Sequence, residues 1–100
     1  MLDEQLSYFL KKLGQRLRQA RIARKDSQKN FSFRIGVSIP TLHKMETGSP
    51  QVAIGTWAAA LDILGCATDL EKLILPKKSL AERFEFQHKN TDRQRVKRKG

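Results

Sequence analysis

The chain has 100 residues, a formal net charge of +10 and a pI of about 10.3, so it has room for one domain with a single small core. The basic excess favours a polyanionic partner: nucleic acid, an anionic membrane surface or an acidic protein. No apolar run approaches the roughly 20 residues that span a bilayer, and residues 1–5 lack the features of a signal peptide. A lone Cys66 excludes an internal disulfide framework. We therefore expect a cytoplasmic protein.

Helical periodicity dominates residues 1–76 and predicts an all-α domain. The first predicted helix covers about residues 4–24, with Asp3 as its N-cap. Gly14 interrupts the pattern, so the segment is either one helix or two that bend there. Apolar residues at steps of three and four define one face of this helix: Leu6, Leu10, Leu13, Leu17 and Ala20.

Two short helices follow. Ser27 is positioned to cap a helix over about 28–35 that ends at Gly36, and Ser38 is positioned to cap a third helix over about 39–47. Pro40 fits the first turn of the third helix, because the N–H that proline lacks has no intrahelical partner there.

Further along, a fourth helix is predicted at about 53–64 and a fifth from Thr68 to about Leu75, opened by a capping box between Thr68 and Glu71. Pro76 closes the compact part. The region of the fourth and fifth helices is the candidate for a dimer interface. The fourth helix carries an apolar stripe that is either core or part of this interface: Ile54, Trp57, Leu61 and Leu64.

Residues 77–100 form a basic tail that holds nine of the 20 Lys and Arg residues. Residues 77–88 favour a short helix or an extended arm, a brief alternation at 83–87 is the one strand-like pattern, and the composition beyond about residue 89 predicts disorder. The tail could contact DNA phosphates, bind an acidic groove of a partner or serve only solubility. Its candidate contact residues are Arg93, Arg95, Lys97, Arg98 and Lys99.

The central segment, about residues 28–47, has the spacing of a helix-turn-helix: two short helices joined by a brief turn that contains Gly36. The glycine allows the chain to leave the first helix through a positive φ. Small and apolar residues are expected to hold the second helix against the first: Phe31, Ser32, Ile35, Val37, Leu42 and Met45. The outer face of the second helix is then free to enter a DNA major groove.

The stretch "LGQRLRQARIARKDSQKNFSFRIGVSIPTLHKMETG", residues 13–48, resembles the Cro/C1-type (XRE) family of bacterial helix-turn-helix regulators. This resemblance implies a five-helix, lambda-repressor-like domain that binds a double-stranded DNA operator, as a homodimer, in the bacterial cytoplasm and nucleoid. The continuation "GSPQVAIGTWAAALDILGCATDLEKLILP" and the tail ending "RQRVKRK" are similar to HipB-type antitoxins. That similarity implies an antitoxin and repressor of a type II toxin-antitoxin operon, with a HipA-like kinase toxin as partner.

The resemblance also assigns roles to individual residues. It implies that Ser27 and Gln28 bind the DNA phosphates, with Gln28 as the usual phosphate contact, and that Arg21 pairs with Glu46 to brace the third helix. It places base-reading or groove-facing positions at Ser38, Ile39, Pro40, Thr41 and Lys44. His43 lies next to these positions, either toward the DNA backbone or at the surface.

Several residues depart from the family pattern. Ser32 replaces the usual alanine between the two helices, Phe33 replaces a polar residue, Ala53 replaces a capping serine, and Ile39 and Pro40 replace polar base readers. Two alternatives therefore stay open: a stand-alone phage-type repressor, and a protein-interaction adaptor with weak DNA binding. The sequence contains no motif of an enzyme, a metal site, a cofactor or a small-molecule substrate.

Overall fold

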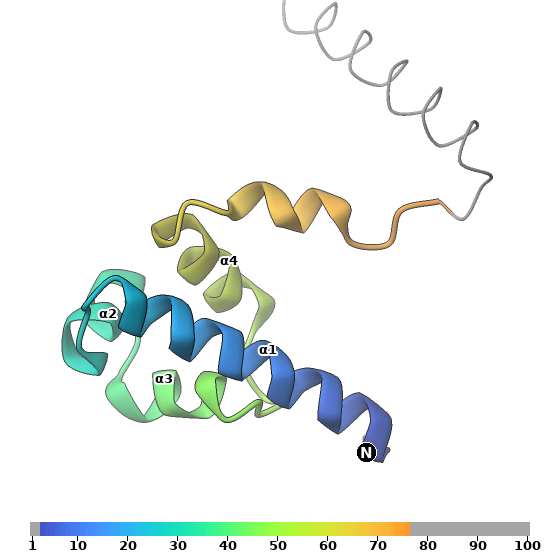
Figure 1. Ribbon diagram of the computed structural model, residues 1–100, viewed down its shortest axis with the longest axis horizontal. Helices are drawn as coiled ribbons and strands as arrows, with labels where there is room; N and C mark the ends of the chain where they lie inside the picture. The colour runs from blue at the N-terminus through green and yellow to red at the C-terminus, as the bar shows by residue number, and fades with distance from the viewer. Residues whose placement is uncertain (1–2, 77–100) are drawn as a thin grey trace, which may run out of the picture. The chain divides into compact units, whose positions relative to one another are not determined.

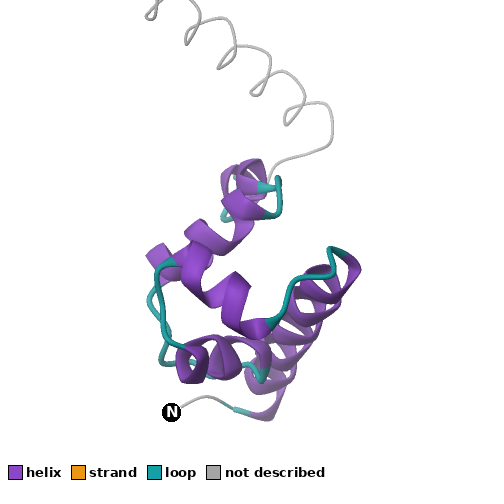
Figure 2. Cartoon of the chain, turned by 90° about the vertical axis from the view of Figure 1, so that its left-hand side faces the viewer, coloured by secondary structure: helices purple, strands orange, loops and turns teal. Residues whose placement is uncertain are grey.

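The computed structural model describes residues 3–76, and these residues form five helices and no strand (Figures 1 and 2). The helices are α1 (Glu4–Ala23), α2 (Gln28–Ile35), α3 (Ile39–Glu46), α4 (Ile54–Ile63) and the 3-10 helix η1 (Ala67–Lys72). The predicted all-α fold with five helices is thus confirmed. The strand-like pattern at 83–87 and the tail contacts lie outside the described residues. Within residues 3–76, no helix is long and apolar enough to cross a membrane.

Helix α1 is one continuous helix of 20 residues, so Gly14 does not divide it. Asp3 caps it as predicted, accepting a hydrogen bond of 2.8 Å from the backbone N–H of Leu6. The reason for a glycine at position 14 is close packing: a Cβ there would lie 2.6 Å from the backbone carbonyl oxygens of Met45 and Glu46 at the end of α3. Gly14 therefore permits α1 to cross α3 at contact distance.

Helices α2 and α3 begin at the predicted serines. Ser27 Oγ accepts from the N–H of Asn30 at 3.0 Å, and Ser38 Oγ accepts from the N–H of Thr41 at 3.2 Å. Gly36 ends α2 with a φ of 77°, in the left-handed region that glycine adopts at little cost. These local interactions set the direction in which α3 leaves α2.

The core lies where α2 and α3 pack on each other, with α1 packed on α3 and α4 on α2. Its buried apolar residues are Leu17, Phe31, Ile35, Leu42, Met45 and Ala60. Five of the six residues predicted to join α2 and α3 are buried, and Val37 is half-buried against the same core. The predicted apolar face of α1 is buried only in part, because Leu17 lies in the core while Leu6 and Leu13 stay exposed.

Helix α4 begins without a side-chain cap, because Ala53 occupies the N-cap position. Trp57 and Leu64 pack against the core, whereas Ile54 is 71% exposed. The predicted stripe therefore divides between core and surface.

The expectation that Thr68 caps the fifth helix is wrong. The helix begins at Ala67, one residue earlier, and the carbonyl of Cys66 accepts from the N–H of Asp69 at 3.0 Å. It is a 3-10 helix that ends at Lys72 rather than an α-helix reaching Leu75. Because a 3-10 helix closes its hydrogen bonds three residues apart, a short segment can form one without a complete capping box. The compact unit that contains α1 to α4 extends to Leu70, and a second unit begins at Glu71.

Candidate nucleic-acid interface

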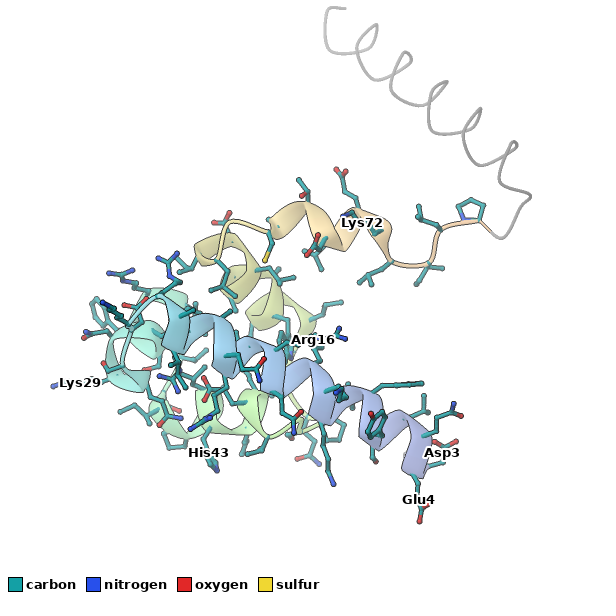
Figure 3. All side chains as sticks on the ribbon, viewed as in Figure 1. Asp3, Glu4, Arg16, Lys29, His43 and Lys72 are labelled. Carbon is teal, nitrogen blue, oxygen red and sulfur yellow. The ribbon has the colours of Figure 1, made fainter. Side chains whose placement is uncertain are left out.

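The outer face of α3 is a continuous exposed surface, and its opposite face is buried. Leu42 and Met45 anchor the inner face with no exposed surface. The exposed side chains of the segment recur at steps of three and four along the helix: Ile39, Pro40, His43, Lys44 and Thr47. Figure 3 shows His43 pointing away from the helices. This outer face has one cationic side chain, Lys44, and no carboxylate, because Glu46 is buried. An anionic groove can therefore approach α3 without meeting a like charge there.

The hydroxyl groups at the start of α3 are already engaged within the helix. Ser38 Oγ donates to Thr41 Oγ1 at 3.1 Å while accepting from the Thr41 backbone N–H. Thr41 is half-buried, so it is less available to a base than its neighbours. The first turn of α3 thus presents the apolar surface of Ile39 and Pro40, and its two hydroxyls stabilise the cap.

Gln28 lies at the first position of α2 and turns its amide toward α3. Its Nε2 donates to Glu46 Oε1 at 3.2 Å. One of the two Nε2 hydrogens is used in this bond, and the second remains able to donate to a phosphate oxygen. The predicted phosphate contact is therefore compatible with a bracing role of the same amide.

The ion pair that the family resemblance implies is present and almost fully buried. Arg21 Nε donates to Glu46 Oε2 at 2.6 Å and Arg21 Nη2 donates to Glu46 Oε1 at 3.2 Å, with side-chain exposures of 9% and 3%. Arg21 Nη1 also donates to the carbonyl of Asp26 at 2.8 Å. Together with Gln28, these bonds tie the end of α3 to α1, to the loop before α2 and to the start of α2.

Close backbone contact with α1 also holds this end of α3. Gly48 follows α3 with a φ of 83°, and a Cβ there would lie 2.7 Å from the backbone N and Cα of Lys11. Gly14 makes the reciprocal approach from α1 to the carbonyls of α3. The outer face of α3 is therefore presented by a helix whose position is fixed by packing and by charge.

The structure places four of the predicted contact residues, Ile39, Pro40, His43 and Lys44, on the outer face of α3, and it adds a residue that the sequence interpretation did not include. Thr47 is exposed on the outer face of α3, and its Oγ1 donates to the carbonyl of His43 at 3.0 Å. Its spacing of four residues from His43 could have indicated this position. Lys29 on α2 is a further exposed cation that points outward (Figure 3). In residues 3–76, no three His, Cys, Asp or Glu side chains gather as metal ligands would.

A family model described as a helix-turn-helix domain matches residues 12–73, which covers the whole arrangement from the middle of α1 to the end of η1. The chain belongs to this helix-turn-helix domain family, in agreement with the XRE-like pattern of its sequence. Searches of curated proteins and of solved structures gave no significant match.

Proposed function

We propose that this chain is a sequence-specific DNA-binding transcriptional repressor that acts as a homodimer. The observation that carries the proposal is the outer face of α3, exposed along its length and free of carboxylates, while the helix is held by the buried Arg21–Glu46 pair. A rigidly held helix with an uncharged-to-basic outer face suits insertion in a major groove. The membership in the helix-turn-helix family supports the same function.

Contacts to phosphates position the protein on the duplex, and contacts from the outer face of α3 to the bases distinguish one DNA sequence from another. The free hydrogen of Gln28 Nε2, the exposed Lys29 and the backbone N–H groups at the helix starts are the proposed phosphate donors. Lys44 is long enough to reach guanine O6 or N7, and His43 presents two ring nitrogens beside it. Ile39 and Pro40 suit thymine methyl groups, which are the apolar feature of the major groove.

Replacing Lys44 with alanine is expected to weaken binding to the operator by about 1–3 kcal/mol, because the alanine side chain cannot reach a base. Fluorescence anisotropy with the DNA upstream of the gene and with random DNA measures both affinities. Lys12→Ala is the matched control, since Lys12 is an exposed lysine on α1 that lies over the ring of Tyr8. We expect this control to change both affinities little. If Lys44→Ala weakened binding to operator and random DNA equally, Lys44 would bind a phosphate and would not read a base.

We further propose the more specific role of antitoxin to a HipA-like kinase toxin. The similarity of residues 48–76 to HipB-type antitoxins and the basic end of the tail support it. The toxin would bind a surface outside α3, so that one chain can hold toxin and operator together. A kinase-like reading frame beside the gene, whose product co-purifies with this chain and is less toxic in its presence, would bear out this role. A genomic neighbourhood without such a frame would favour a stand-alone phage-type repressor.

The basic tail is proposed to bind further phosphates of the DNA. Deleting residues 89–100 removes six basic residues: Lys89, Arg93, Arg95, Lys97, Arg98 and Lys99. The slope of log affinity against log salt is expected to become shallower by about 0.9 for each phosphate that the shortened chain no longer neutralises. Titrations at several salt concentrations give this slope. A slope that the deletion leaves unchanged would assign the tail to a protein partner instead.

A further inference from the structure

The N-terminal half of α1 carries an apolar strip that the described residues cover only in part. Leu6, Phe9 and Leu13 are 46%, 52% and 39% exposed, and we call these three residues the α1 seam. Their spacing of three and then four residues places them on one side of the helix. This is the spacing at which the a and d residues of paired helices meet.

The packing of the domain covers the α1 seam only in part. The closest approach of α3 and its following loop to α1 falls at Leu10, Lys11 and Gly14, and Leu6 and Leu13 lie beside Leu10 at the edge of this packed face, with Phe9 further out. Figure 1 shows the first turns of α1 extending past the end of α3. An exposed strip of two leucines and a phenylalanine is more apolar surface than isolated exposed residues account for.

We propose that the α1 seam binds the α1 seam of a second copy of this chain, with the two helices antiparallel. In this arrangement Leu6 of each copy packs against Leu13 of the other. Phe9 then lies at the centre of the contact, beside Phe9 of the second copy. Because both copies use the same surface, the contact is isologous. It is complete in a dimer and leaves no free surface for further copies to add.

Charge at the two ends of the α1 seam favours the antiparallel arrangement. Asp3 lies three residues before Leu6 and Arg16 lies three residues after Leu13. Antiparallel pairing therefore brings the carboxylate of Asp3 beside the guanidinium of Arg16 from the second copy, and symmetry repeats the pair. Arg16 makes no hydrogen bond or ion pair with the residues that the structure describes. Parallel pairing would instead place Asp3 against Asp3 and Arg16 against Arg16.

The sequence-based candidate for the dimer interface, the region of the fourth and fifth helices, also exposes large apolar side chains, namely Ile54 on α4 and Leu73, Ile74 and Leu75 after η1. Ile54 is the one large apolar side chain of α4 that is exposed, and the other three are consecutive residues beyond the end of η1, so the four do not form a stripe along one helix. The α1 seam is a stripe of three residues along one helix, which is the arrangement that helix pairing requires. A pair of helices meeting over two turns still buries less than a standard protein interface, so the dimer is expected to be weak and to depend on concentration.

Disulfide cross-linking tests the pairing and its direction in the full chain. In a Cys66→Ala background, Leu6→Cys and Leu13→Cys chains are made separately, mixed and oxidised, with Ile22→Cys, an exposed position outside the α1 seam, as control. The proposal predicts cross-links between position 6 of one chain and position 13 of the other, and few cross-links of either chain with itself. Preferential cross-links of position 6 with 6 and of 13 with 13, or no more cross-linking than Ile22→Cys gives, would overturn it.

Sedimentation of the full chain over a concentration series gives an independent measurement. Phe9→Glu is expected to raise the dimer dissociation constant at least tenfold, while Ile54→Glu leaves it unchanged, with circular dichroism showing that both variants remain helical. The proposal is overturned if Ile54→Glu dissociates the dimer and Phe9→Glu does not. It is overturned equally if the chain is monomeric throughout. Protection of a Phe9→Cys thiol from alkylation in such a monomer would then assign the α1 seam to a contact within the same chain. The inference rests on the homodimer of the proposed function, so a monomeric chain would overturn both. DNA binding itself is tested separately, because neither readout involves DNA.

Discussion

Replacing Glu46 with alanine is expected to lower the free energy of unfolding by about 3–5 kcal/mol, because the change leaves Arg21 charged and buried without its partner. Arg21 donates to both carboxylate oxygens of Glu46, and the two side chains expose only 9% and 3% of their surface. The substitution also removes the acceptor of the Gln28 amide. Urea denaturation followed by circular dichroism measures the effect.

The double substitution Arg21→Met with Glu46→Leu separates the buried charge from the packing of the two side chains. Replacing both members of a buried pair with apolar residues of similar size is often neutral or stabilising, so the double variant should be clearly more stable than Glu46→Ala alone. A destabilisation below about 1 kcal/mol for Glu46→Ala would mean that the pair is as weak as an exposed one. The explanation of how α3 is held would then be wrong.

Replacing Gly14 with alanine is expected to destabilise the domain by about 1–3 kcal/mol or more, because α1 and α3 must move apart. The new Cβ would lie 2.6 Å from two backbone carbonyl oxygens of α3, and backbone atoms cannot turn aside as a flexible side chain can. The same change should weaken DNA binding, since it displaces the end of the proposed recognition helix. Thermal or urea unfolding and operator titration check the two effects.

Gly55→Ala is the matched control, because Gly55 also lies within a helix, while a Cβ there would meet nothing within 4 Å. Alanine is favoured over glycine in a helix interior by about 0.5–1 kcal/mol, and Gly55 lies in the first turn of α4, so this variant should be as stable as the natural chain or slightly more stable. If Gly14→Ala also stabilised the protein, the close crossing of α1 and α3 would not be present in solution.

The parts of the fold that could be predicted from sequence rest on short-range interactions. Ser27 and Ser38 cap their helices through the N–H group three residues ahead, and Gly36 ends α2 through its own backbone conformation. The apolar spacing of Phe31, Leu42 and their neighbours indicated which faces of α2 and α3 meet. Such features depend on a few consecutive residues, and sequence spacing alone defines them.

The features that sequence could not settle depend on residues far apart in the chain. Gly14 looked like a possible bend, and only its approach to α3, more than thirty residues later, shows it to be a packing position. In the same way, the amide of Gln28 turns to Glu46, and the hydroxyl of Thr41 is occupied by Ser38. The pattern that indicated an α-helical fifth element did not specify a 3-10 helix.

The candidate interface was therefore only partly predictable. The positions Ile39, Pro40 and Lys44 follow from helical periodicity once the start of α3 is known. The spacing of four residues between His43 and Thr47 indicates the position of Thr47, but Thr47 follows the last residue of α3, so the structure was needed to show that its side chain is exposed there. The charge on this face also required the structure, since the position of Glu46 in the core leaves Lys44 without a neighbouring carboxylate on the outer surface.

The measurement that tests the central claim most directly is the affinity of the full chain for the DNA upstream of its own gene, compared with random DNA of equal length at physiological salt. A helix-turn-helix protein that reads bases through the outer face of α3 should bind its operator at least about 1,000-fold more tightly than random DNA. Equal affinity for the two DNAs would contradict sequence-specific recognition and would favour the protein-interaction adaptor.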